Sequence, residues 1–414
     1  MKLNIDQAIA GRIKNAWAAL SPEQQNNITP LLAKAHQQAV GFTQTGTAPP
    51  QDPAVKHQLL LAQSVLSDDK DGVLDNLGAG VVVDVNPEGE IWGTGKYEQL
   101  DPCWTEAVAV WMEHLVLGKH PFPAAIPNSI PIPDAVQIGM AGDWGTGNWR
   151  ADPNPAPSTR VRKAMANLNL DLTVHLGDVY YAGSNEQEQN FLLDLWPAGR
   201  LGALTLNSNH EMYPGGDAYF QRTLASPLFA LQQQRSFFAL ENSDWVIVGL
   251  DSAYYSDEQK LYLDGALYPH GGPQIQLQFL QAQVAKGKRV IVLTHHNGLT
   301  QDGSAPTLLW SQVTSAFPAG AGPAYWYWGH VHAGAVYQTT AITGNVSCRC
   351  NGHGALPWGL ASDLANPNVA WYEKRSANDP EIPERVLNGF AVLYLDGPKL
   401  TEVFYDENGG VAWP

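Results

Sequence analysis

Five polar clusters, each placed directly after a short apolar run, constrain the fold of this chain more than any other feature. The apolar runs cover residues 136–141, 172–176, 201–206, 289–293 and 324–328. Runs of this length that are rich in β-branched and aromatic residues and end at glycine or a polar turn are typical of buried strands. The clusters are therefore expected at the C-terminal ends of strands, which is where an α/β fold builds its site.

These clusters are rich in side chains that bind metal ions through oxygen or nitrogen. Asp, Asn and His suit iron, zinc, manganese or magnesium better than they suit soft metals. Six potential ligands recur, which is approximately the number that a two-metal site about 3.5–4 Å across requires. They are Asp143, Asp178, Asn209, His295, His330 and His332. Asp178 is the best candidate for a carboxylate shared between two ions.

Net charge and hydropathy argue against two classes of partner. The 414-residue chain has a formal charge of −16, whereas a protein that binds a phosphate backbone needs a positive face, so no nucleic-acid partner is expected. No stretch approaches about 18 consecutive apolar residues, so no membrane span is expected either. A small phosphorylated substrate is compatible with this charge, because two bound cations would invert the local field in a pocket.

The sequence also favours a reducing compartment. Residues 1–20 include charged side chains and lack the continuous apolar core of a secretory signal. The three cysteines, Cys103, Cys348 and Cys350, cannot supply a disulfide framework. A cytoplasmic location is therefore expected, and secretion is the alternative if a signal has been removed.

The first part of the chain is expected to be mainly helical. Apolar residues recur at near-helical spacing up to about residue 66, and Ser21-Pro22 is typical of an N-cap followed by proline at the first helical position. Residues 79–98 are typical of a hairpin, and residues 104–117 of an amphipathic helix. Residues 67–72 resemble part of a calcium loop without its final glutamate, so a solvated turn is preferred.

Prolines between residues 121 and 133 break any regular element, and a domain boundary is placed there. The expected division is a segment of residues 1–130 and a domain of residues 131–414. In the second part, apolar runs alternate with helical stretches. Two hairpin-like pairs, in residues 236–250 and 389–405, indicate a layered α/β sandwich rather than a purely parallel sheet.

The order of the polar clusters resembles the metallophosphoesterase superfamily with the calcineurin-like fold, over residues 134–414. Within it, the pattern is most similar to the purple acid phosphatases. Most superfamily members carry Asp-x-His in the first cluster, but Gly145 stands at the third position here. Purple acid phosphatases lack the same histidine and have a tyrosine three residues after the shared aspartate, which is Tyr181. The resemblance implies an α/β/β/α sandwich with an N-terminal helical segment added to it.

The resemblance also implies a ligand set for each of two metals. The first, expected to be Fe(3+), would be held by Asp143, Asp178, Tyr181 and His332. The second, Fe(2+), Zn(2+) or Mn(2+), would be held by Asp178, Asn209, His295 and His330. A tyrosinate ligand is chemically reasonable, because a phenol with a pKa near 10 needs a strongly Lewis-acidic ion to keep it ionised at neutral pH.

Three further residues are candidates for catalysis by the same resemblance. His210 matches the family histidine that contacts the phosphate, and Glu211 is expected to orient that imidazole or its loop. The family's second substrate-contacting histidine is missing, and His296 or Asp302 are the candidates to replace it. His296 is also the alternative to His295 as a metal ligand. Ser208 departs from the glycine that most members carry before Asn-His-Glu.

The expected activity is metal-dependent hydrolysis of small phosphate monoesters. A phosphodiesterase using the same site and a catalytically silent metal-binding scaffold are the alternatives. Two other patterns are given structural interpretations. His175 is expected to be a packed core histidine, and Cys348, Cys350 and His353 lack the fourth ligand of a structural zinc site.

Overall fold

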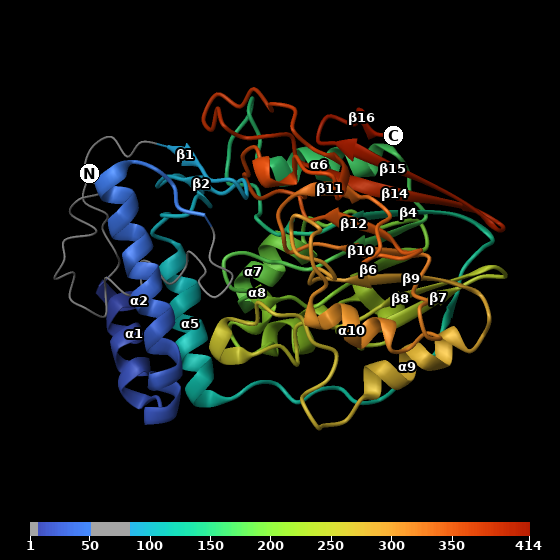
Figure 1. Cartoon of the computed structure of the whole chain (residues 1–414), viewed down its shortest axis with the longest axis horizontal. Coiled ribbons are helices and arrows are strands. Elements are labelled where there is room, and N and C mark those ends of the chain that lie inside the picture. Colours follow the sequence, from blue (N-terminus) through green and yellow to red (C-terminus); the bar gives the residue numbers. More distant parts are fainter. Residues whose placement is uncertain (1–6, 51–82) are drawn as a thin grey trace.

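The computed structural model describes residues 7–50 and 83–414 (Figure 1). The calcium-like stretch 67–72, the first residues of the expected hairpin and the end of the expected N-terminal helical region lie outside the described residues. Within the described ranges, no helix has the combined length and apolar character needed to cross a membrane.

The described residues contain two large sheets. The first has six strands in the order β16-β15-β14-β4-β5-β6. Strands β4, β5 and β6 are parallel neighbours, and β14 pairs antiparallel with β4 and with β15. Their bounds are β4 Ala135–Ala141, β5 Leu172–His175, β6 Gly202–Thr205, β14 Gly389–Asp396, β15 Lys399–Asp406 and β16 Val411–Trp413.

The second sheet has eight strands in the order β13-β11-β12-β10-β9-β8-β7-β3. Strands β8, β9, β10 and β12 run parallel to one another. Strand β7 pairs antiparallel with β8 and parallel with β3, and β11 pairs antiparallel with β12 and with β13. The bounds are β3 Ile130–Pro131, β7 Phe238–Glu241, β8 Trp245–Gly249, β9 Arg289–Thr294, β10 Tyr325–Trp328, β11 Gly334–Tyr337, β12 Ser347–Asn351 and β13 Val369–Tyr372.

The two sheets pack face to face. One buried cluster combines apolar residues of both, among them Ile138 and Val174 from the first sheet and Ile247 and Leu293 from the second. Helix α6 (Pro157–Asn167) buries Val161 against the outer side of the first sheet, and α9 (Ile275–Val284) and α10 (Leu308–Thr314) pack against the second. The predicted layered α/β/β/α sandwich is confirmed.

Shorter helical turns complete the loops between these layers. They are α7 Asn185–Gln187, the π-helices η1 Glu188–Leu193 and η2 Tyr219–Thr223, α8 Asn209–Met212, and the 3-10 helices η3 Pro227–Gln232, η4 Glu258–Lys260 and η5 Ser362–Leu364. Helix α8 follows β6 and carries the Asn-His-Glu cluster.

The N-terminal elements form a helical layer beside the sandwich (Figure 1). They are α1 (Gln7–Ala19), α2 (Pro22–Thr45), the short paired strands β1 (Asp84–Val85) and β2 (Ile91–Trp92), and α5 (Trp104–Leu117). Ser21 is the N-cap of α2 and Pro22 its first residue, as the sequence predicted. Ser21 accepts from the backbone of Gln24, whose side chain bonds back to the Ser21 N–H, so the two residues form a capping box.

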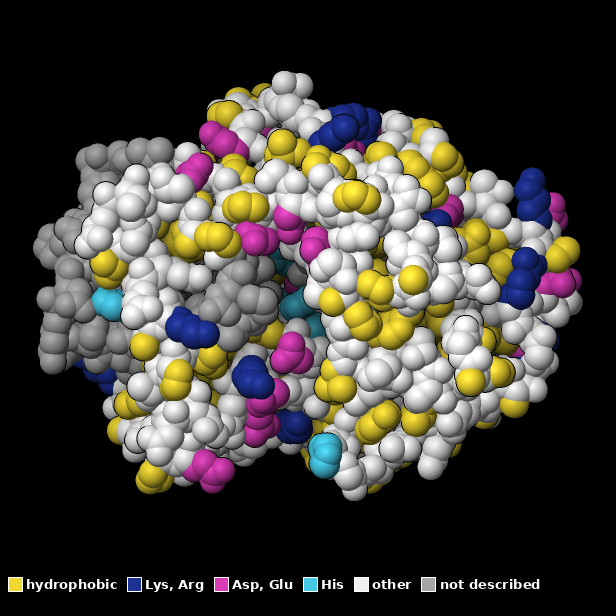
Figure 2. All heavy atoms as spheres, viewed as in Figure 1, with side chains coloured by type: hydrophobic (Ala, Val, Ile, Leu, Met, Phe, Trp, Pro, Cys, Tyr) yellow, Lys and Arg dark blue, Asp and Glu magenta, His cyan; other side chains and the backbone are white. Residues whose placement is uncertain are grey.

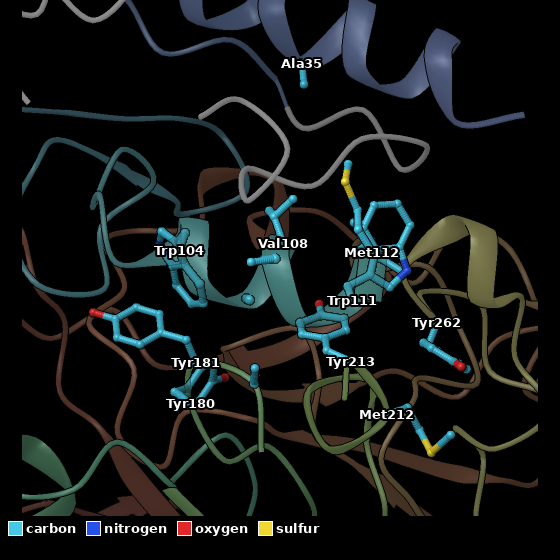
Figure 3. Close-up of a cluster of buried hydrophobic side chains, with 14 of the residues drawn as sticks. Ala35, Trp104, Val108, Trp111, Met112, Tyr180, Tyr181, Met212, Tyr213 and Tyr262 are labelled. Atoms are coloured by element: carbon cyan, nitrogen blue, oxygen red, sulfur yellow. The ribbon is translucent and has the colours of Figure 1, made fainter. Parts of the chain in front are cut away.

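This helical layer shares its core with loops of the sandwich. Trp104 and Trp111 of α5 belong to the same buried cluster as Tyr180, Tyr181 and Tyr213, which follow β5 and β6 (Figure 3). The division at residue 130 stays a prediction. The continuous core indicates that α5 supports the loops that carry the polar clusters.

Candidate metal centre

The C-terminal ends of five strands bring the predicted ligands to one place. Asp143, Asp178 and Asn209 follow β4, β5 and β6 of the first sheet. His295 follows β9 of the second sheet, and the loop after β10 carries His330 and His332. Neighbouring parallel strands end at the same sheet edge, so residues far apart in sequence converge there.

One group of donor atoms gathers around Asn209. Its Oδ1 lies 2.9 Å from His295 Nε2 and 3.1 Å from His330 Nδ1. The two histidine nitrogens are 3.2 Å apart, and His295 Nε2 is 3.3 Å from Asp178 Oδ1. Four donor atoms, from two loops of each sheet, thus face a common point.

A second group gathers on the other side of Asp178. His332 Nε2 lies 3.2 Å from Asp143 Oδ1 and 3.9 Å from Asp178 Oδ2. The Tyr180 hydroxyl lies 2.8 Å from Asp178 Oδ2, 3.0 Å from His332 Nε2 and 3.4 Å from Asp143 Oδ1. Asp143, Asp178 and His332 form one of the candidate metal-binding groups among the described residues.

The spacing of these atoms fits metal coordination. Bonds of about 2.0–2.1 Å from a metal to its ligands place neighbouring ligand atoms about 2.9–3.4 Å apart in octahedral or tetrahedral geometry. Most of the distances within the two groups fall in this range. Asp178 presents Oδ1 to one group and Oδ2 to the other, which is the arrangement that a bridging carboxylate needs.

The structure does not bring Tyr181 into this cluster. Its hydroxyl donates to Asp101 in a buried contact, and its ring stacks on Tyr97. Tyr180 points its hydroxyl between Asp143, Asp178 and His332 instead. The sequence-based choice of Tyr181 as the tyrosine ligand therefore disagrees with the geometry, because only the neighbouring side chain reaches the other donors.

The loops that carry the metal-binding side chains hold four residues in backbone conformations that non-glycine residues rarely adopt. Asp143, Asp178, His330 and His332 have φ values of 57°, 79°, 68° and 46°. Non-glycine residues in this left-handed region cluster at functional sites, where the surrounding structure offsets the strain. Gly177 precedes Asp178 because a Cβ there would lie 2.7 Å from His295 Nδ1 and 2.8 Å from the Ser208 side chain.

Backbone and side-chain contacts fix the orientation of the donors. The His295 Nδ1–H donates to the Leu176 carbonyl at 2.9 Å, which leaves the Nε2 lone pair facing the cluster. The Asn209 Nδ2 donates to the Tyr213 hydroxyl at 3.0 Å, so its oxygen faces the histidines. The His330 N–H donates to Asp143 Oδ2 at 2.8 Å and leaves Oδ1 for the second group.

Two buried carboxylates lie side by side in this cluster. Burial and the neighbouring Asp178 raise the pKa of Asp143 to about 8. Burial also opposes ionisation of Asp178, but His210 and His295 hold the pKa of that carboxyl well below its usual range. Burial and the same two carboxylates raise the pKa of the Tyr180 phenol. Cations between these groups would offset the repulsion between two carboxylates, so the donor set fits metal ions.

His210 lies at the edge of the cluster. Its Nδ1–H donates to the Tyr181 carbonyl at 2.7 Å, and its Nε2 lies 3.8 Å from Asp178 Oδ2. Burial lowers the pKa of His210 to about 4. The imidazole is thus held in one orientation, with Nε2 directed toward the space beside the shared carboxylate.

Glu211 supports the loop rather than the His210 ring. Its carboxyl group contacts the Ser208 hydroxyl and accepts from the Asp178 N–H at 3.3 Å. Ser208 caps α8 by accepting from the His210 N–H and also donates to Asp178 Oδ1 at 2.5 Å. The serine at the usual glycine position therefore positions the shared aspartate. Glu211 was expected to orient either the His210 ring or its loop, and these contacts fit the second role.

His296 lies beside His295 and His330, and these three histidines form the other candidate metal-binding group among the described residues, but both ring nitrogens of His296 already have hydrogen-bond partners within the protein. Its Nε2–H donates to the Tyr262 carbonyl at 2.7 Å, and its Nδ1 accepts from the Ser252 hydroxyl at 2.9 Å. These bonds position the loop of residues 261–265, so the geometry favours His295 as the ligand. Asp302, the other candidate second contact, accepts from Thr300 and Ser304 within its own loop.

A cavity of about 260 Å³ opens over the cluster. Asp178, Asn209, His210, His330 and His332 form part of its lining. Figure 2 shows a hollow near the centre of this face with histidine side chains inside it and acidic side chains at its rim. Its walls also include residues that the sequence did not single out, namely Glu90, Leu263, Asp264, Gln301, Leu308 and Trp358.

The structural interpretations of two other patterns agree with the geometry. His175 is fully buried and contacts the Thr205 hydroxyl at 3.2 Å. Cys348 and Cys350 lie buried on β12, and among the described residues neither joins a group that could hold a metal ion.

Comparison with known protein families gives a match over part of the chain. Residues 136–334 match the sequence model of the family of calcineurin-like phosphoesterases. A search of curated proteins finds no match to the chain.

Several solved structures are similar at low identity. A purple acid phosphatase from yellow lupin seeds (Lupinus luteus) is 15% identical with a TM-score of 0.47, and the match covers 71% of this chain and 54% of that one. A dimetal phosphatase from Danio rerio is 16% identical with a TM-score of 0.40, covering 66% and 95%. GAP50, the anchor in the inner membrane complex of Plasmodium, is 13% identical with a TM-score of 0.46, covering 67% and 87%. The match therefore spans about half the length of the lupin enzyme.

Proposed function

We propose that the protein hydrolyses small phosphate monoesters at a dinuclear metal centre, on the premise that residues 136–334 match the family model of the calcineurin-like phosphoesterases. One observation supports the proposal most strongly. Two groups of metal-binding atoms share a single buried carboxylate, Asp178, at the floor of an open cavity.

The proposed ligand sets follow the two groups. Asp143, Asp178, Tyr180 and His332 would hold the first metal, and Asp178, Asn209, His295 and His330 the second. With Tyr180 replacing Tyr181, the first set keeps the tyrosinate that suits Fe(3+), and the second suits Fe(2+), Zn(2+) or Mn(2+). When bound, such ions would polarise the phosphoryl oxygens and supply an activated water for in-line displacement.

The protein's own residues bind and orient the ester. His210 Nε2 faces the cavity beside Asp178, where it can form a hydrogen bond to a bound phosphoryl group or leaving oxygen. The Tyr181 carbonyl fixes the ring, and the Ser208–Glu211 pair holds both α8 and Asp178. The substrate would thus bind beside a histidine ring whose orientation is fixed, over a cavity floor that these contacts hold in place.

Metal content and turnover of p-nitrophenyl phosphate, measured together, test this proposal. Asp178→Asn removes a charge from both groups, and His332→Ala removes a donor from the group that contains Asp143. Both variants should lose at least one metal ion per chain and reduce turnover by at least about 10³-fold. Asp396→Asn, at an exposed hairpin position, is the matched control and should keep both properties.

Full metal content with full turnover in Asp178→Asn would reject the proposal. Full metal content without turnover of any ester in the unaltered protein would favour the scaffold alternative. A comparison of p-nitrophenyl phosphate with bis(p-nitrophenyl) phosphate decides between a monoesterase and a phosphodiesterase, and the proposal predicts faster hydrolysis of the monoester.

A further inference from the structure

The walls of the cavity carry carboxylates, and the described residues that line it include no lysine or arginine. Glu90 lies on the wall formed by the turn between β1 and β2, and Asp264 lies on the wall formed by residues 261–265. Phosphate-binding pockets without metals normally use arginine or lysine to hold a phosphoryl group. Here the positive charge would come from the metals at the floor, and the walls are acidic.

Contacts within the protein fix the position of each wall. The Trp358 Nε1–H and the Gln301 amide both donate to the Glu88 carbonyl, at 2.9 and 2.8 Å, so the β1–β2 turn is joined to Trp358 and Gln301. Glu90 accepts from the Asn86 side chain at 2.6 Å. The wall that carries Glu90 is therefore built into the fold rather than formed by a loose side chain.

His296 anchors the wall that carries Asp264. It donates to the Tyr262 carbonyl, and Gly265 packs so closely on its ring that a Cβ there would lie 2.5 Å from the His296 Cβ. The Ser256 hydroxyl donates to the Asp264 carbonyl at 2.5 Å. The Asp264 side chain itself is exposed at the rim.

Apolar side chains line the same cavity as these carboxylates. Trp358 lines the cavity with its ring centroid 4.7 Å from that of His332, and Leu263 and Leu308 add aliphatic surface. Aromatic faces combined with carboxylates are typical of sites that bind alkylammonium groups. The cavity volume of about 260 Å³ lies just below the range of about 300–1,000 Å³ for drug-sized ligands, so a small leaving group fits best.

We propose, on the basis of the proposed function, that the preferred substrate is a small phosphate ester whose alcohol carries a positively charged amine, such as an ester of an amino alcohol. The metals would hold the phosphoryl group, while Glu90, Asp264 and Trp358 receive the cation. Polyphosphorylated substrates are disfavoured, because their additional negative charges would face these carboxylates without a lysine or arginine in the described lining.

Phosphocholine and its uncharged carbon isostere, 3,3-dimethylbutyl phosphate, provide a direct test, because they differ in one charge and have nearly the same shape. We expect the metal-loaded protein to show a kcat/KM at least about tenfold higher for phosphocholine, mainly through a lower KM. Raising the salt concentration should reduce this ratio, because the Asp264 carboxylate is exposed.

Two variants test which residues cause the preference for phosphocholine over its uncharged isostere. Asp264→Asn should lower the ratio about threefold or more, and Asp264→Asn combined with Glu90→Gln should bring it close to one. Asp396→Asn carries the same chemical change at a distant exposed position and should leave the ratio unchanged. A ratio near one in the unaltered protein, or a ratio insensitive to Asp264→Asn and to the double change, would overturn the inference.

A binding measurement separates this inference from the proposed function. If the metal-loaded protein hydrolyses p-nitrophenyl phosphate but does not distinguish the isosteres, the inference alone fails. If it hydrolyses no ester, the proposed function fails, and calorimetric titration of phosphocholine and 3,3-dimethylbutyl phosphate still decides the charge preference by the same expected ratio of affinities.

Discussion

At two adjacent tyrosines, the spacing pattern in the sequence does not predict which side chain faces the metal-binding atoms. A spacing of three residues from Asp178 selects Tyr181, yet the structure directs Tyr180 to the donors and Tyr181 to Asp101. Spacing alone does not fix side-chain direction in an irregular loop after a strand. The convergence of the six Asp, Asn and His side chains was predictable because each follows a strand whose end position is fixed by the sheet.

The visible spectrum of the ferric protein distinguishes the two tyrosines. Tyr180→Phe should abolish a tyrosinate-to-iron absorption band, because it removes the hydroxyl that lies between Asp143, Asp178 and His332. Tyr181→Phe, the matched change one residue away, should keep the band. The reverse pattern would restore Tyr181 as the ligand.

His210→Ala tests the residue assigned to the phosphoryl group. Because its ring contacts the cavity but is not a proposed ligand, turnover should fall by about 10²–10⁴-fold while metal content stays unchanged. His270→Ala, at an exposed position, serves as the control. Loss of metal in His210→Ala would instead indicate that the imidazole maintains the site itself.

At the scale of elements, helix α5 was predicted at its observed bounds because its apolar residues follow helical spacing. Strand β12 (Ser347–Asn351) was not predicted, because its sequence Ser-Cys-Arg-Cys-Asn lacks a strand pattern. Its pairing with β10 and β11 holds it in an extended conformation. The role of the N-terminal layer could not be predicted either. Its contacts with the loop after β5 join residues about 80 positions apart.

Asp101 connects α5 to the metal-binding loop. Its carboxylate accepts from the Tyr181 hydroxyl, from the Tyr97 N–H at 2.8 Å and from the Cys103 N–H at 3.0 Å. Asp101→Asn should lower the free energy of unfolding by about 1–3 kcal/mol, because these buried donors would lose a charged acceptor. Urea titration measures this, with Asp396→Asn as control. An unchanged midpoint would show that α5 does not depend on this contact.

At the scale of the whole molecule, a buried charge network joins the loop after β4 to the C-terminal strands. Asp379 accepts from Arg150 at 2.6 Å and from Arg385 at 2.9 Å, and Arg385 also bonds Glu407 at 2.6 Å. Burial opposes ionisation of Asp379, but the two arginines hold the pKa of its carboxyl below the usual range. A lowered pKa stabilises the fold above about pH 4, and this contribution is lost as the pH falls further.

Asp379→Asn should therefore lower the free energy of unfolding by about 3–5 kcal/mol at pH 7, because two buried arginines lose a charged partner. The difference from the unaltered protein should shrink as the pH falls below about 4, because the Asp379 carboxyl of the unfolded chain then begins to protonate while that of the folded protein stays ionised to lower pH. Urea titrations at pH 7, 5 and 3 measure it. A difference that stays constant over this range would contradict the assigned cause.

Anomalous scattering from crystals of the metal-loaded protein tests the central claim most directly. The account predicts two metal positions about 3.5–4 Å apart, with one oxygen of Asp178 bound to each and the Tyr180 hydroxyl on the ion that also contacts Asp143 and His332. A single ion, or two ions that do not share Asp178, would contradict it.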